Sequence, residues 1–107
     1  AVTSNAVNNA LSKYKKHFDR WLTIPKGNSA NLDISSLELH NLYIIKIGSN
    51  NPGIWRYCGI IGRSIQYYTL TQLDKGLRLS VTFTDFNTIT ITNDDKEYDT
   101  GLNIEIL

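Results

Sequence analysis

The chain has 107 residues, of which 41% are hydrophobic, and a formal net charge of +1. Near-neutral charge disfavours a general attraction to nucleic acid or to membrane surfaces, and the sequence has no apolar run of about 18 residues that would span a bilayer. Cys58 is the only cysteine, which excludes a disulfide within the chain and a multi-cysteine zinc site.

The first predicted element is a helix from about residue 5 to residue 22. Thr3, Ser4 and Asn5 carry side-chain oxygens that can cap it. The helix should end before Pro25, because the residue before a proline is pushed out of helical conformation. Apolar residues with the 3.5-residue average spacing of a coiled coil follow the cap: Val7, Leu11, Tyr14, Phe18 and Trp21. Residues 1–24 are therefore predicted to be a helical stalk that mediates oligomerisation.

Three arrangements of this stalk remain open. Three aromatic side chains are wide for a pair of helices, and a homotrimer leaves more room along the axis. In a second arrangement, Phe18, Trp21 and Leu22 fold back onto the chain's own sheet, and in a third the stalk forms another oligomer. A homotrimer is the arrangement that we expect.

Beyond Pro25 the hydrophobic period changes to 2, which indicates strands. Strands are predicted within residues 32–34, 37–39, 42–47, 54–61, 64–70, 77–83, 89–91 and 102–107. Short strands separated by turn residues, with no further helix, favour a β-sandwich or jelly roll. The predicted fold is thus mainly β: an N-terminal coiled-coil-like helix followed by a small antiparallel head over residues 25–107.

Residues 2–11 read Val-Thr-Ser-Asn-Ala-Val-Asn-Asn-Ala-Leu. This segment resembles the VTSNAVxxAL segment of tail fibre, baseplate and receptor-binding proteins of bacteriophages and prophages. The resemblance implies a trimeric stalk before a small β-structured head that contacts the host surface. It also implies that the remainder of a tail fibre or baseplate is a partner, and that the protein is located in the virion. Nothing from residue 25 onward matches the family motif by motif, so no binding residue is carried over.

An aromatic group in the middle of the chain is the best candidate for a ligand site. Flat rings with a polar edge, such as Trp55, Tyr57, Tyr67 and Tyr68, suit stacking against the apolar face of a sugar. Arg56 lies beside the aromatic residues, and Asn50 and Asn51 lie in the preceding loop, so all three add hydrogen-bonding groups. Loops commonly carry recognition residues. The candidate ligand-binding residues are Asn50, Asn51, Trp55, Arg56, Tyr57 and Tyr68. The alternative is that Trp55 and Tyr57 are core residues of the sandwich.

No catalytic site, metal site or cofactor is predicted. His17 and His40 lack the spacing of metal ligands. Cys58 lies in a hydrophobic strand, and nothing in the sequence points to an activating histidine. The acidic residues of 94–99 lack the spacing and glycine of a calcium loop, and we expect a solvated turn there.

The sequence as a whole favours a non-enzymatic tip module of a phage tail fibre, which trimerises and attaches to a host-surface glycan or protein. Two alternatives are kept. The first is a structural trimerisation and folding cap of a longer fibre. The second is a small polysaccharide hydrolase that uses carboxylates such as Asp95 and Asp99, although a small sandwich offers little cleft for a substrate.

Overall fold

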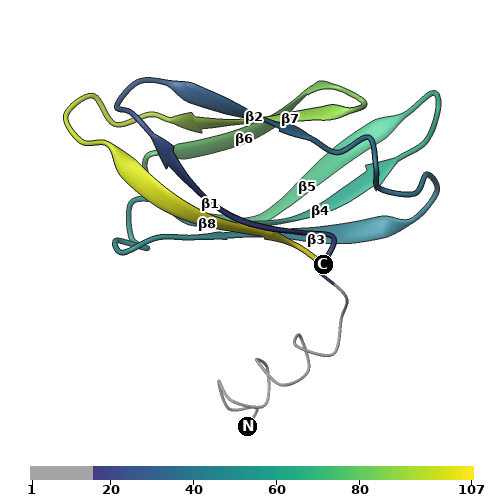
Figure 1. Cartoon of the computed structure of the whole chain (residues 1–107), viewed down its shortest axis with the longest axis horizontal. Coiled ribbons are helices and arrows are strands. Elements are labelled where there is room, and N and C mark those ends of the chain that lie inside the picture. The colour runs from purple at the N-terminus through teal and green to yellow at the C-terminus, as the bar shows by residue number, and fades with distance from the viewer. Residues whose placement is uncertain (1–15) are drawn as a thin grey trace, which may run out of the picture.

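Two antiparallel sheets pack face to face in the computed structural model, which describes residues 16–107 (Figure 1). The larger sheet has the strand order β1-β8-β3-β4-β5 and the smaller sheet has the order β2-β7-β6. The five strands of the larger sheet are β1 (Phe18–Ile24), β8 (Thr100–Ile106), β3 (Leu42–Gly48), β4 (Tyr57–Arg63) and β5 (Tyr68–Lys75). The three strands of the smaller sheet are β2 (Ser29–Asp33), β7 (Thr88–Asn93) and β6 (Leu79–Asp85).

The core lies between the two sheets and is built from alternating apolar residues. In β7, Ile89 and Ile91 are buried while the threonines between them are partly exposed. In β8, Leu102, Ile104 and Ile106 are buried in the same way. Because successive side chains of a strand point to opposite faces, this period of 2 places one face of each sheet in the core. β7 and β8 have a partner strand on both sides, so each lies in the interior of its sheet.

The helix predicted over residues 5–22 is wrong in the part of the chain that the structure describes. Phe18–Ile24 forms β1, which pairs along its whole length with β8. Phe18, Leu22 and Ile24 are separated by even numbers of residues, so in a strand their side chains lie on one face. That face packs against the core, while the backbone of β1 pairs with β8. Residues 16–107 are therefore all-β, and the predicted helix-plus-head architecture is corrected accordingly.

The predicted oligomerisation residues divide into two groups. Val7, Leu11 and Tyr14 lie outside the described residues. Phe18 packs against the core, whereas Trp21 is exposed. Residues three apart in a strand point to opposite faces, so Phe18 and Trp21 do not form one stripe as they would on a helix.

The described residues, 16–107, contain no helical segment with the length and hydrophobicity needed to span a membrane.

Asn93, at the end of β7, links several segments of the core. Its side-chain oxygen accepts hydrogen bonds from Trp55 Nε1 at 2.9 Å and from the Asp95 amide at 3.0 Å. Its side-chain nitrogen donates to the carbonyls of Ile24 at 3.1 Å and Tyr98 at 2.9 Å. All hydrogen-bonding groups of this fully buried amide are thus satisfied.

Arg63, the last residue of β4, is buried at the opposite end of β4 from Tyr57 and holds two connections together. Nη1 donates to the Phe86 carbonyl at 3.2 Å and to Asn87 Oδ1 at 3.0 Å, in the turn between β6 and β7. Nη2 donates to the carbonyls of Ser35 and Leu37, in the connection between β2 and β3. One guanidinium therefore fixes both a turn of the smaller sheet and the connection that joins the two sheets.

Candidate functional site

Two of the predicted binding residues lie in the core. Trp55 and Tyr57 are buried between the sheets, and the indole nitrogen of Trp55 donates to Asn93. Their rings are therefore not presented at the surface. The alternative that the sequence left open, in which Trp55 and Tyr57 are core residues, describes their positions in the structure.

The other residues of that region stabilise a turn between β3 and β4. The Asn51 carbonyl accepts hydrogen bonds from the amides of Ile54 at 3.1 Å and Trp55 at 3.0 Å. Asn50 and Asn51 are exposed, and Arg56 donates to the Pro52 carbonyl at 2.9 Å. The structure thus places the side chains of Asn50, Asn51 and Arg56 at the surface, without an exposed aromatic ring from Trp55 or Tyr57 beside them.

Arg56 is also paired with Asp74 on the neighbouring strand. Arg56 Nε lies 2.8 Å from Asp74 Oδ2 and Nη2 lies 3.1 Å from Oδ1. This hydrogen-bonded pair lowers the pKa of the Asp74 carboxyl and raises the pKa of Arg56. Because the guanidinium is already engaged by Asp74 and by a carbonyl, it offers few free donors to a ligand.

The pair predicts a specific pH dependence of stability. The pKa of Asp74 is lower in the folded state than in the unfolded state. Its contribution is therefore fully present above the unfolded value, near 3.9, and is lost as the pH falls through the folded value. Urea denaturation at pH 7 should show Asp74→Asn to be slightly less stable than wild type, because exposed pairs contribute little. The two stabilities should converge below about pH 4, and a constant difference down to pH 2 would contradict the assignment.

Two neighbouring exposed aromatic side chains lie at the other end of β4, at the turn that leads into β5. Tyr67 is 74% exposed, and Tyr68 and Ile65 are also exposed. Tyr67 and Tyr68 border a shallow hollow of about 190 Å³, whose other lining residues are Gly62, Arg63, Ser64 and Thr69. We call Tyr67 and Tyr68 the tyrosine ledge.

Two sets of contacts hold the ledge in place. The Ser64 amide donates to the Tyr67 carbonyl at 2.6 Å, and the Tyr67 amide donates to Ser64 Oγ at 3.1 Å, which closes the turn. The Tyr68 ring packs against the Phe83 ring of β6 with a centroid distance of 4.9 Å. The ledge therefore bridges the edge strands of the two sheets, because Tyr68 belongs to β5 and Phe83 to β6.

The ligand-binding residues predicted from the sequence include Tyr68 but not Tyr67. The signal that identifies Tyr67 is its place after Ser64, a residue that commonly closes turns with its hydroxyl. Tyr67 precedes β5, so the alternation of that strand does not govern it.

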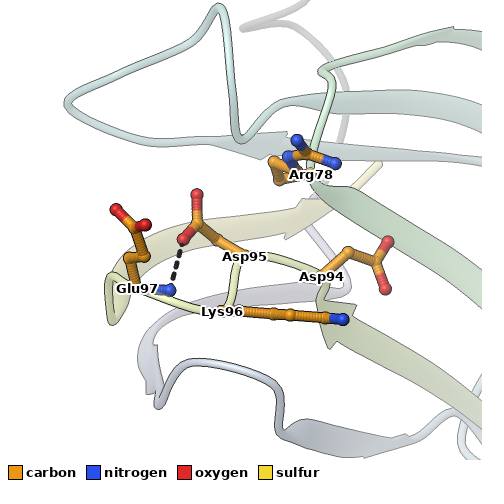
Figure 2. Close-up of a pocket in the computed structure, with 5 residues that line it drawn as sticks. All are labelled: Arg78, Asp94, Asp95, Lys96 and Glu97. Carbon is orange, nitrogen blue, oxygen red and sulfur yellow. Dashed lines mark hydrogen bonds between the residues drawn. The ribbon is translucent and has the colours of Figure 1, made fainter.

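The acidic segment between β7 and β8 is a folded loop closed by hydrogen bonds to Asp95. Asp95 Oδ1 accepts the amides of Glu97 at 2.7 Å and Tyr98 at 3.0 Å. Figure 2 shows the Asp94 and Glu97 carboxylates lying on opposite sides of Asp95, with Lys96 in the same loop and Arg78 nearby. Asp94 accepts from the Ser80 hydroxyl. Within residues 16–107 no group of three His, Cys, Asp or Glu side chains is placed to hold a metal ion.

Cys58, His17 and His40 lie on different segments of the described fold. Cys58 is partly buried, and burial raises the pKa of its thiol, which disfavours the nucleophilic thiolate. The His17 ring packs edge-on against the Tyr43 ring with a centroid distance of 5.0 Å. His40 has a positive φ of 69° in the turn before β3.

The tyrosine ledge thus presents two exposed tyrosines and neighbouring hydroxyl groups on a hydrogen-bonded turn. Comparison with known proteins adds no assignment: no family model, no curated protein and no solved structure matches this chain.

Proposed function

We propose that this chain is a non-enzymatic attachment module of a phage tail fibre, which binds a host-surface glycan at the tyrosine ledge. The observation that carries the proposal is the pair of exposed tyrosines beside a hollow lined by hydroxyl groups. The assignment to a phage tail, and so to the virion, rests on the resemblance of residues 2–11 to stalk segments of tail fibre proteins.

The chemistry of the ledge suits a sugar. A tyrosine ring stacks on the apolar face of a pyranose, and its hydroxyl remains available for a hydrogen bond. Ser64 and Thr69 supply further hydroxyl groups at the same hollow. Arg63 adds no free charge there, since its terminal nitrogens are engaged by loop carbonyls and by Asn87.

A hollow of about 190 Å³ is small and supports only weak binding by one copy. The homotrimer that the sequence predicts would present three ledges on one fibre tip. Linked sites raise the overall affinity by about 10²-fold or more when the receptors lie within reach of one another. Weak single sites are therefore compatible with firm attachment.

The experiment compares two tyrosines of similar exposure. Wild type, Tyr67→Ala and Tyr98→Ala are tested against immobilised lipopolysaccharide and capsular polysaccharide from a panel of bacteria. Tyr98 is 63% exposed and lies in the loop between β7 and β8, so it serves as the matched control. We expect Tyr67→Ala to weaken binding at least tenfold, about 1.4 kcal/mol, and Tyr98→Ala to leave binding unchanged.

Two results would overturn the proposal. Equal binding by wild type and Tyr67→Ala would place any glycan site elsewhere. Attachment to whole cells that disappears after protease treatment, with no binding to the isolated polysaccharides, would show that the receptor is a protein.

A further inference from the structure

The outer face of the five-stranded sheet carries an apolar groove that the core does not use. In the sheet register, Ile44 lies opposite Ile60, and Leu42 lies opposite Gly62. Leu107 continues β8 along β3, since it exchanges two backbone hydrogen bonds with Ile44, at 2.8 and 3.0 Å. We call Leu42, Ile44, Ile60 and Leu107 the outer groove.

The groove is a formed feature of the surface. Leu42, Ile44, Ile60 and Leu107, together with Tyr43, line a hollow of about 280 Å³. A second hollow of about 450 Å³ adjoins it, because Leu42, Tyr43 and Leu107 line both. Gly62 leaves room for Leu42 to lie across the sheet, since a Cβ there would come within 3.2 Å of Leu42 Cδ2.

The exposure of Leu42 is unusual for an antiparallel sheet. One face of such a sheet commonly packs on the core and the other carries polar residues. Leu42 is 76% exposed at a strand position that faces away from the core, with apolar neighbours on β4 and at the end of β8. Contiguous apolar surface of this kind marks an interaction site.

We infer that the outer groove is an interface between copies of this chain. The inference is independent of the proposed glycan site, which lies on the turn between β4 and β5. The occupant is a second copy for two reasons, one of position and one of charge.

The first reason is where the described part of the chain begins. Lys16 Nζ lies 3.0 Å from Glu105 and 3.5 Å from Asp19, both on the outer face of the sheet. The His17 amide bonds to the Ile106 carbonyl at 2.7 Å, and His17 lines the second hollow. Residues 1–15, which include the predicted oligomerisation residues Val7, Leu11 and Tyr14, precede Lys16 in the chain and are thus attached to the fold beside the groove. Association there brings identical faces together.

The second reason is the balance of charge beside the groove. The neighbouring row of the sheet carries Asp19, Glu105 and Lys46 opposite one another, and Lys16 pairs with both acids. Two positive and two negative groups leave this row without net charge. Identical faces therefore meet without strong repulsion, and apolar burial in the groove is left to favour contact.

The main experiment uses the full chain and two leucines of equal exposure. Leu77 is 75% exposed, against 76% for Leu42, and lies in the connection between β5 and β6. The solution masses of wild type, Leu42→Glu and Leu77→Glu are measured by sedimentation equilibrium over a range of concentrations. We expect the solution masses of wild type and Leu77→Glu to be at least twice the 12.1 kDa of one chain. Leu42→Glu should dissociate at a concentration at least tenfold higher.

Cys58 gives a second readout without substitution. It is partly exposed and lies on the outer face, opposite Lys46. We expect its rate of labelling by a bulky maleimide to fall as the protein concentration rises. Three results overturn the inference: a monomeric wild type, an oligomer that Leu42→Glu leaves unchanged, or protection of Cys58 that does not depend on concentration. The last result would show that the chain's own residues cover the groove.

Discussion

Replacement of Asn93 by aspartate is expected to cost about 3 kcal/mol or more of stability at pH 7. The aspartate keeps the shape and accepts from Trp55 Nε1, but when ionised it has no N–H for the carbonyls of Ile24 and Tyr98. Two carbonyls then lose their donor, and a charge is placed in a site that is fully buried. Leaving buried polar groups unpaired costs about 1–3 kcal/mol each, and burying a charge adds to this cost.

The variant also makes a distinctive pH prediction. Burial should raise the pKa of the introduced carboxyl above its unfolded value of about 3.9. The loss relative to wild type should therefore be smallest below the unfolded value and grow as the pH rises through the folded value. Urea denaturation of wild type, Asn93→Asp and Asn93→Ala at pH 3 and pH 7 tests this. Only the aspartate variant should recover stability at low pH, and equal losses for both variants at both pH values would contradict the prediction.

The regions where one face is buried and the other is wet could be predicted from alternation alone. The strand predicted over 77–83 overlaps β6, in which Leu79 and Val81 are buried, and the threonines and isoleucines of 89–91 lie within β7. In these segments the local pattern and the tertiary packing require the same residues to be inside. The period of 2 therefore identified both the element and its buried face.

Segments in which buried residues lie in turns could not be placed in this way. Leu37 suggested a strand, but the Leu37 amide bonds to the Ile34 carbonyl at 3.1 Å and both side chains are buried within a turn. Trp55 likewise precedes β4 and is buried in the core, where Asn93 accepts a hydrogen bond from its indole nitrogen. Both positions depend on contacts with residues distant in the sequence, which periodicity does not report.

The helix predicted over residues 5–22 was wrong at residues 18–22 for a related reason. Phe18 and Leu22 satisfy helical spacing and strand spacing equally well, and the partner that selects the strand, β8, lies more than 70 residues further along the chain. For the candidate site, alternation correctly grouped Tyr57 with Ile61 on one face. It did not determine whether that face points inward, because this depends on how the second sheet packs.

Replacement of Arg63 by methionine is expected to lower the free energy of unfolding by about 2–4 kcal/mol. Methionine fills much of the same space but removes four hydrogen bonds, to the carbonyls of Ser35, Leu37 and Phe86 and to Asn87 Oδ1. Hydrogen bonds to charged groups contribute about 1.5–3 kcal/mol each, and relief from burying the guanidinium offsets part of the loss.

Arg63→Lys separates the geometry of this contact from its charge. A single ammonium group keeps the positive charge but cannot reach both loops, since the two terminal nitrogens of Arg63 point to different connections. Lysine should therefore restore less than half of the stability that methionine loses in urea denaturation. Hydrogen exchange should accelerate in both connections, at the Leu37 amide, which bonds to the Ile34 carbonyl at 3.1 Å, and at the Asn87 amide, which bonds to Asp85 Oδ1 at 2.9 Å. Full rescue by lysine would show that charge alone holds this end of the fold. Faster exchange in one loop only would show that Arg63 does not join the two.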